Sequence, residues 1–240
     1  MKTRVLAVPG TWDFAPGMLG GVTRHLDTSK FDITFIKYPQ TFALPVSYAR
    51  SKRIAIDRLR EEWERDLKAP IVLLGYSQGA DAVGDFARMV EHHPRLKAVA
   101  LVADPKRPRG VQIGSKRLTG HGIAGERPIN HPNVWQAAYA GDVICDATEG
   151  SLWRAIADTT QYAGLNLPTW VKELFKVCLR PGGLQLAPPM DAGSRIWGAI
   201  AAIPELYRYL TGWHTAYGAV ECPGTGRTYL RELAHRINQL

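Results

Sequence analysis

The sequence predicts an α/β fold with a central, mostly parallel sheet. Short apolar runs alternate along the chain with longer segments whose apolar residues recur at helical spacing. The clearest run is Ile71–Leu74, a strand expected to be buried on both faces. It leads into Gly75-Tyr76-Ser77-Gln78-Gly79 and then into the helical segment Ala80–Val90. A length of 240 residues suits a single domain over residues 1–240.

Before this run, the predicted order is strand, helix, strand, helix. These elements cover Arg4–Val8, Gly17–Leu26, Phe31–Tyr38 and Ser47–Lys68. The long helix is expected to bury one apolar face, marked by Ile56, Leu59, Trp63 and Leu67. Its other side is expected to carry ion pairs at i,i+4, namely Arg58/Glu62, Arg60/Glu64 and Glu61/Arg65.

Two further strands and a terminal helix complete the alternation. The strands cover Leu96–Ala103 and Val134–Ala140, and residues 106–127 between them, rich in Gly, Arg and Lys, are predicted to form a loop. The terminal helix has an apolar inner face made of Tyr229, Leu230, Leu233, Ile237 and Leu240.

Residues 146–213 break the alternation, because they contain no convincing strand. Three helices are predicted there, over Leu152–Tyr162, Trp170–Leu179 and Ser194–Leu210. We expect this segment to be a helical insertion within the single domain. Its aromatic and apolar residues either pack on one another and on the sheet or line a groove for an apolar substrate.

Gly75, Ser77 and Gly79 form the pattern Gly-x-Ser-x-Gly between a strand and a helix. In that context the pattern predicts a nucleophile elbow, a sharp turn that holds the serine in a strained backbone conformation. The turn lifts the serine hydroxyl clear of the sheet, so we predict Ser77 as a catalytic nucleophile. The alternative is a plain strand-to-helix turn that happens to contain a serine.

A serine hydroxyl needs a base, and His214 is the predicted one. In this arrangement the order along the chain is serine, then acid, then histidine. The chain has 7 histidines, and most of them precede the nucleophile or the acid, or lie far along a helix. His214 lies in a loop between the insertion and the terminal helix. The alternative for His214 is a surface histidine.

Two aspartates are candidates for the acid that orients this histidine, because each follows a predicted buried strand. Asp142 is favoured on chain order, whereas Asp104 precedes Pro105 and could instead hold its own loop. The oxyanion hole is expected to use the amide of Gln78 and, from the loop after the first strand, that of Thr11. An ordinary Pro-Gly turn is the alternative for the loop of Thr11.

The composition argues against several other kinds of function. A net charge of +8 favours attraction to an anionic surface, but Lys and Arg are scattered and no helix-turn-helix, zinc-finger or RNP pattern occurs. We therefore expect no nucleic-acid partner. The 3 cysteines are widely spaced without a CxxC pair, which predicts no metal site and at most one disulfide. Serine chemistry implies no organic cofactor.

Three motifs occur in order along the chain: Gly-Tyr-Ser-Gln-Gly at 75–79, Gly-Asp-x-x-Cys at 141–145 and His-Thr-Ala-Tyr-Gly at 214–218. Together they resemble the cutinase-like branch of the α/β-hydrolases, and within it the lysin B esterases of mycobacteriophages. The resemblance covers nearly the whole chain. It implies an α/β-hydrolase fold, a triad of Ser77, Asp142 and His214, and an oxyanion hole of Gln78 and Thr11. It also implies that the insertion at residues 146–213 corresponds to the linker helices of that family.

The resemblance also implies a substrate. Lysin B esterases cut mycolic acids from arabinogalactan, so the expected partner is the mycolyl-arabinogalactan ester of a mycobacterial envelope. We expect a monomer in peripheral contact with that envelope. The runner-up functions are a cutinase-like lipase or carboxylesterase and an acyltransferase, in which a sugar hydroxyl replaces water. A non-catalytic envelope-binding module is the hypothesis from another class.

Two departures from cutinases bear on where the protein is made. Cutinases carry a disulfide across the loop that holds the catalytic aspartate. In this chain Ala138 stands at the position of the first cysteine of that disulfide, so Cys145 lacks that partner. The apolar run Val5–Val8 is too short for a signal peptide. We therefore expect the protein to be made in the host cytoplasm and to act on the outer envelope after lysis.

Overall fold

A five-stranded sheet forms the centre of the computed structural model, which describes residues 1–42, 45–148, 154 and 212–240. Its strands are β1 (Thr3–Val8), β2 (Phe31–Phe35), β3 (Ile71–Tyr76), β4 (Leu96–Val102) and β5 (Val134–Ala137). They lie in the order β2-β1-β3-β4-β5, and every neighbouring pair is parallel. The predicted α/β class and parallel sheet are confirmed.

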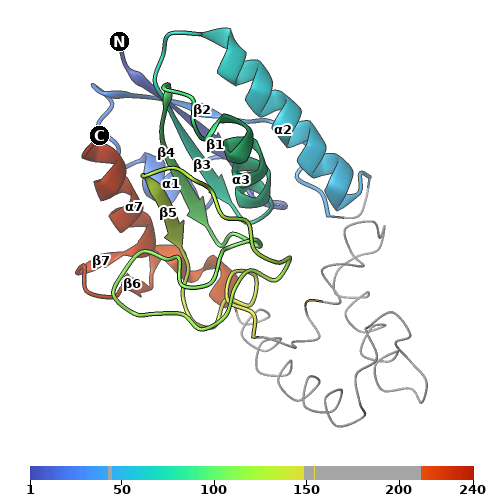
Figure 1. Cartoon of the computed structure of the whole chain (residues 1–240), viewed down its shortest axis with the longest axis vertical. Coiled ribbons are helices and arrows are strands. Elements are labelled where there is room, and N and C mark those ends of the chain that lie inside the picture. Colours follow the sequence, from blue (N-terminus) through green and yellow to red (C-terminus); the bar gives the residue numbers. More distant parts are fainter. Residues whose placement is uncertain (43–44, 149–153, 155–211) are drawn as a thin grey trace.

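Helices cover both faces of the sheet (Figure 1). One face carries α2 (Tyr48–Arg65) and α3 (Gln78–Val90), and the other carries α1 (Gly20–Thr23) and α7 (Tyr229–Asn238). Alternate residues of each strand serve the two faces, so that Leu6 of β1 packs toward α2 and α3 while Val5 packs toward α1 and α7. Because both of its faces are covered, the central strand β3 is buried at every position rather than at alternate ones.

Several elements are shorter than predicted. The first helix covers only Gly20–Thr23, since it begins with two glycines, which are poor helix formers. β2 ends at Phe35 rather than Tyr38, because its partner β1 ends at Val8, directly before Pro9. β5 likewise ends at Ala137, where its pairing with β4 stops.

The buried face of α2 differs from the prediction at its end. Leu59 and Trp63 are buried as expected, but the helix ends at Arg65 and Leu67 is 71% exposed. The ion pairs also differ. Glu62 pairs with Arg4 of β1 at 2.5 Å rather than with Arg58, which bonds Glu61 instead. Glu62 thus takes one partner from β1 and a second, Arg65 at 2.7 Å, from the same helix but three rather than four residues away.

The end of the chain contains elements that the sequence did not indicate. A short 3-10 helix, η1, covers Trp213–Gly218, and a small antiparallel hairpin joins β6 (Glu221–Cys222) to β7 (Arg227–Thr228). Of the three helices predicted between residues 146 and 213, only Arg154 of the first belongs to the described residues, and it is helical; the rest lie outside them. None of the helices in the described part of the chain is both long and apolar enough to cross a membrane.

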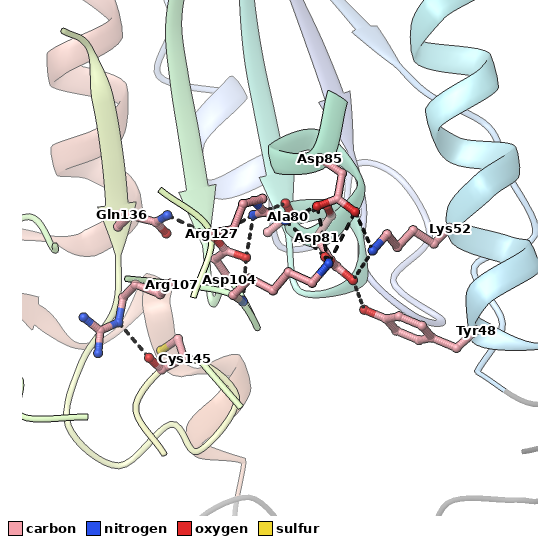
Figure 2. A network of polar contacts seen from close by, with 11 residues as sticks. Tyr48, Lys52, Ala80, Asp81, Asp85, Asp104, Arg107, Arg127, Gln136 and Cys145 are labelled. Carbon is pink, nitrogen blue, oxygen red and sulfur yellow. Dashed lines mark hydrogen bonds and ion pairs between the residues drawn. The ribbon is translucent and has the colours of Figure 1, made fainter. Parts of the chain in front are cut away.

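A buried cluster of charged side chains ties the loop after β4 to α2 and α3 (Figure 2). Arg127 is 4% exposed and lies 2.8 Å from Asp104, 3.1 Å from Asp81 and 2.9 Å from Asp85. The remaining cations of the cluster are Lys52 and Lys106. Arginine and lysine thus balance the aspartates, as buried charges require.

We expect Arg127→Met to lower the free energy of unfolding by about 3–5 kcal/mol, because it leaves buried carboxylates without their cation. Urea denaturation measures the change. Arg60→Met is the matched control, since the exposed pair of Arg60 with Asp57, at 3.8 Å, should contribute less than about 1 kcal/mol. Equal losses in the two variants would contradict a supporting role for the cluster.

Candidate active site

Ser77 occupies the sharp turn between β3 and α3, with φ of 53° and ψ of −117°. Few residues other than glycine adopt a positive φ, so the turn is strained as the elbow prediction requires. Its neighbours leave no room for side chains. A Cβ on Gly75 would lie 2.7 Å from the Ala80 Cα, and one on Gly79 would lie 2.1 Å from the Val8 carbonyl oxygen. The elbow therefore fits only a glycine on each side.

The structure brings Ser77, His214 and Asp142 together, although they come from distant parts of the chain. The Nε2 atom of His214 lies 3.0 Å from the Ser77 hydroxyl oxygen, and its Nδ1 atom lies 3.0 Å from both carboxylate oxygens of Asp142. His214 lies on η1, and Asp142 follows β5. Asp142 is fully buried at its side chain, whereas His214 is 12% exposed.

The chemistry of the carboxylate decides the tautomer of His214. An ionised Asp142 only accepts hydrogen bonds, so the proton between the two side chains belongs to Nδ1. In the neutral imidazole Nε2 then carries a lone pair, which accepts the hydroxyl proton of Ser77. This arrangement can withdraw a proton from the serine oxygen.

Asp142 remains ionised because donors surround it. Burial by itself raises the pKa of a carboxyl group, but the charge of His214 and the donors of Tyr217 and Ile144 outweigh burial. The pKa of this carboxyl group therefore lies below its ordinary value. A lowered pKa means that Asp142 stabilises the folded protein above the unfolded pKa of about 3.9, and that this contribution is lost as the pH falls further.

The alternative acid, Asp104, has other partners. Its carboxylate accepts from Arg127 at 2.8 Å and 2.9 Å, from the Gln136 amide at 2.9 Å and from the Lys106 main chain at 2.9 Å. Asp104 is thus held in the buried cluster beside α3 and holds its own loop, and the imidazole of His214 faces Asp142 instead.

The two predicted oxyanion residues flank the elbow. Gln78 is the first residue of α3, and its side chain is held by the Thr41 carbonyl at 3.0 Å. Thr11 follows Gly10, where an added Cβ would lie 3.2 Å from the Cβ of Ser77. The loop of Thr11 therefore lies against Ser77, and the role of both amides in holding an oxyanion stays a prediction.

Sequence reasoning missed two tyrosines that hold the site. The ring of Tyr76 stacks on His214 with centroids 5.3 Å apart, and its hydroxyl donates to the His214 carbonyl at 3.1 Å. The hydroxyl of Tyr217 donates to Asp142 at 2.6 Å. Both tyrosines belong to the motifs around Ser77 and His214, so the motifs themselves were the available signal.

The acid loop contains a free thiol where the resemblance led us to expect an unpaired cysteine. Cys145 and Cys222 are both free, and Cys145 shares a small apolar cluster with Ala138 and Leu118. Among the described residues, no group of three or more His, Cys, Asp or Glu side chains could hold a metal ion.

Comparison with solved structures shows the fold. The chain matches lysin B from mycobacteriophage D29 over 100% of both chains, with 20% identity and a TM-score of 0.60. It matches the catalytic core of acetyl xylan esterase from Trichoderma reesei with 17% identity and a TM-score of 0.50, covering 65% of this chain and 92% of that one. A cutinase-like protein from Cryptococcus sp. is 19% identical, with a TM-score of 0.47, over 85% of this chain and 95% of that one.

The chain thus has the α/β-hydrolase fold, as the motifs predicted. The resemblance to lysin B is found again at the level of the fold. No protein-family model and no curated protein sequence matches the chain.

We expect a reducing agent to leave the melting temperature within about 1 °C of its value in the oxidised protein, because Cys145 and Cys222 are free. A native disulfide typically contributes about 2–4 kcal/mol, which corresponds to several degrees in a protein of this size. Differential scanning calorimetry with and without dithiothreitol measures the shift. A fall of several degrees would show that a disulfide supports the fold.

Proposed function

We propose that the protein is a serine esterase that hydrolyses carboxylic esters. The observation that carries this proposal is the continuous hydrogen-bonded path from Ser77 through His214 to Asp142, which starts at a residue with φ of 53°. A hydroxyl bonded to an oriented imidazole is an activated nucleophile, and acyl transfer is the chemistry that it performs.

The first half of the reaction acylates the serine. His214 takes the proton of Ser77 at Nε2 as the serine oxygen attacks the ester carbonyl carbon. Asp142 stabilises the imidazolium without taking its proton. The amides of Gln78 and Thr11 donate to the oxyanion that forms. The bond to the alcohol oxygen then breaks, and His214 returns the proton to the leaving alcohol.

The second half releases the acid. Water enters where the alcohol has left, gives a proton to His214 and attacks the acyl carbon. The bond between the acyl carbon and the serine oxygen breaks, the proton returns to Ser77, and the free carboxylic acid leaves.

We further propose that the ester is the one between mycolic acids and arabinogalactan in a mycobacterial envelope. The ordered motifs at 75–79, 141–145 and 214–218 support this, together with the likeness to lysin B over the full length of both chains. The net charge of +8 would assist contact with an anionic envelope, an effect that salt should weaken. The protein would act there as a monomer, after synthesis in the host cytoplasm and lysis of the cell.

We expect Ser77→Ala to lower kcat for a chromogenic short-chain ester on the order of 10⁴-fold or more, because it removes the nucleophile. His214→Ala should lose a similar factor, since the members of a triad act as a unit. The measurement is the initial rate of ester hydrolysis, with circular dichroism to show that each variant is folded.

Ser29→Ala is the matched control, because Ser29 lies exposed at the surface and bonds only its neighbour Asp27 among the described residues. It should hydrolyse the ester at the wild-type rate. Activity in folded Ser77→Ala within about tenfold of wild type would remove Ser77 from the mechanism.

We expect the wild-type protein to release free mycolic acids from delipidated mycobacterial cell wall, whereas Ser77→Ala releases none. Mass spectrometry of the extracted lipids measures the product. Rapid turnover of soluble short esters without any mycolate release would disprove the proposed substrate and leave a general esterase. Wild-type protein that binds cell wall as Ser77→Ala does, with no ester turnover, would favour the binding module.

A further inference from the structure

The hydrogen-bonded path does not end at Asp142. The hydroxyl of Tyr217 lies 2.6 Å from Oδ2 of Asp142, and on its other side it lies 3.2 Å from Sγ of Cys145. The side chains of Tyr217, Asp142 and Cys145 are all essentially inaccessible to solvent. A row of side chains thus leads from the nucleophile through the imidazole and the carboxylate to a phenol and a thiol.

The direction of each hydrogen bond follows from which of these side chains carry a proton. Burial raises the pKa of Tyr217 and of Cys145 well above their usual values, so both groups keep their protons. The phenol has a single proton, and it must point to the carboxylate, which has none to give. The thiol of Cys145 is therefore the donor to the phenol oxygen, with the Asp142 carbonyl as a second acceptor at 3.6 Å.

Packing fixes the ring that carries this hydroxyl. The ring of Tyr217 meets Tyr139 edge to face with centroids 4.8 Å apart, and it meets Tyr229 edge to face at 5.9 Å. The Tyr139 hydroxyl in turn donates to the carbonyl of Trp213, the residue before His214. Aromatic contacts therefore hold both the segment that bears the imidazole and the phenol that meets the carboxylate.

We propose that Tyr217 is a positioning residue of the reaction. Its hydroxyl orients the Asp142 carboxylate and, by bonding one carboxylate oxygen, weakens the attraction of the carboxylate charge for the imidazole proton. This inference rests on the esterase function proposed above. With its Oδ2 bonded to the phenol and its Oδ1 bonded to the Ile144 amide, the carboxylate has one fixed orientation toward Nδ1 of His214. Tyr217 itself touches neither Ser77 nor the reacting atoms, so it acts through Asp142.

Tyr217→Phe isolates this role, because it keeps the ring and removes only the donor. We expect kcat for the chromogenic ester to fall about tenfold, the usual effect of losing one hydrogen bond to a buried charge, with KM changed less than about twofold. The acid limb of the kcat/KM profile should move to higher pH. Loss of a donor raises the pKa of Asp142, and a more basic carboxylate holds a proton on the imidazole more tightly.

The other titratable groups around this pair stay in place in the variant. Within the described residues they are Cys145, Tyr139 and Tyr229, with Tyr76 against His214, Arg107 and Asp146 beyond Cys145, and Asp13 beyond His214. A shift of the acid limb of the kcat/KM profile would therefore result from the loss of the Tyr217 hydroxyl. If Tyr217 had only a structural role, Tyr217→Phe would lower the melting temperature and the rate at every pH but would not shift the acid limb of the profile.

Tyr229→Phe is the matched control. Tyr229 packs against the same ring, is 3% exposed, and within the described residues makes no hydrogen bond to Asp142. Its variant should keep the wild-type kcat and pH profile. Proton NMR provides a readout without turnover, because the signal of the proton between His214 and Asp142 should shift in Tyr217→Phe and not in Tyr229→Phe.

Identical pH profiles and identical NMR signals in the two variants would overturn the proposal. If Tyr217→Phe does not fold, Cys145→Ala serves as a second variant, because it removes the thiol that donates to the phenol oxygen. This variant should shift the same NMR signal by a smaller amount. An unshifted signal in Cys145→Ala would also overturn the proposal. Absence of Ser77-dependent hydrolysis in the wild type would instead disprove the esterase function. The NMR comparison would then decide the role of Tyr217 by itself.

Discussion

The positive φ of Ser77 is the constraint on which the rest of the site depends. A serine does not hold this conformation by itself, so the surroundings must impose it. The Ser77 amide donates to the Val102 carbonyl at 2.9 Å, which fixes the turn to β4, while Gly79 lies against the carbonyls at the end of β1. The elbow is therefore held by the strands on both sides of β3, and the geometry of Ser77 depends on three strands of the sheet.

The same edge of the sheet contains two buried carboxylates that follow neighbouring strands, and their partners separate their functions. Asp104 faces the guanidinium of Arg127, a cation that keeps its proton at every pH a protein experiences. Asp142 faces the imidazole of His214, a group without a permanent charge. Because Arg127 is always charged, its ion pair gives Asp104 a structural role in holding the loop after β4. The imidazole partner lets the second carboxylate stabilise a cation that forms only during the proposed reaction.

The features that depend on local pattern were predictable, and those that depend on contacts across the fold were not. The elbow around Ser77 combines a buried strand, flanking glycines and a helix, all of which are visible in a few residues. The helical spacing predicts Arg58 as the partner of Glu62, but Arg4 of β1 and Arg65 bind its two carboxylate oxygens instead. Likewise, nothing local showed that Tyr217 would meet Asp142, because the contact exists only after the sheet has brought η1 to the end of β5.

Asp142 and His214 are 72 positions apart in the sequence and 3.0 Å apart in space, so the chain between them is a loop closed by the site itself. The entropy of closing a loop grows only with the logarithm of its length, and doubling the length costs about 0.6 kcal/mol. A change in the number of residues between these two positions would therefore cost little free energy, and the contact between Asp142 and His214 does not depend on one particular length of the chain that joins them.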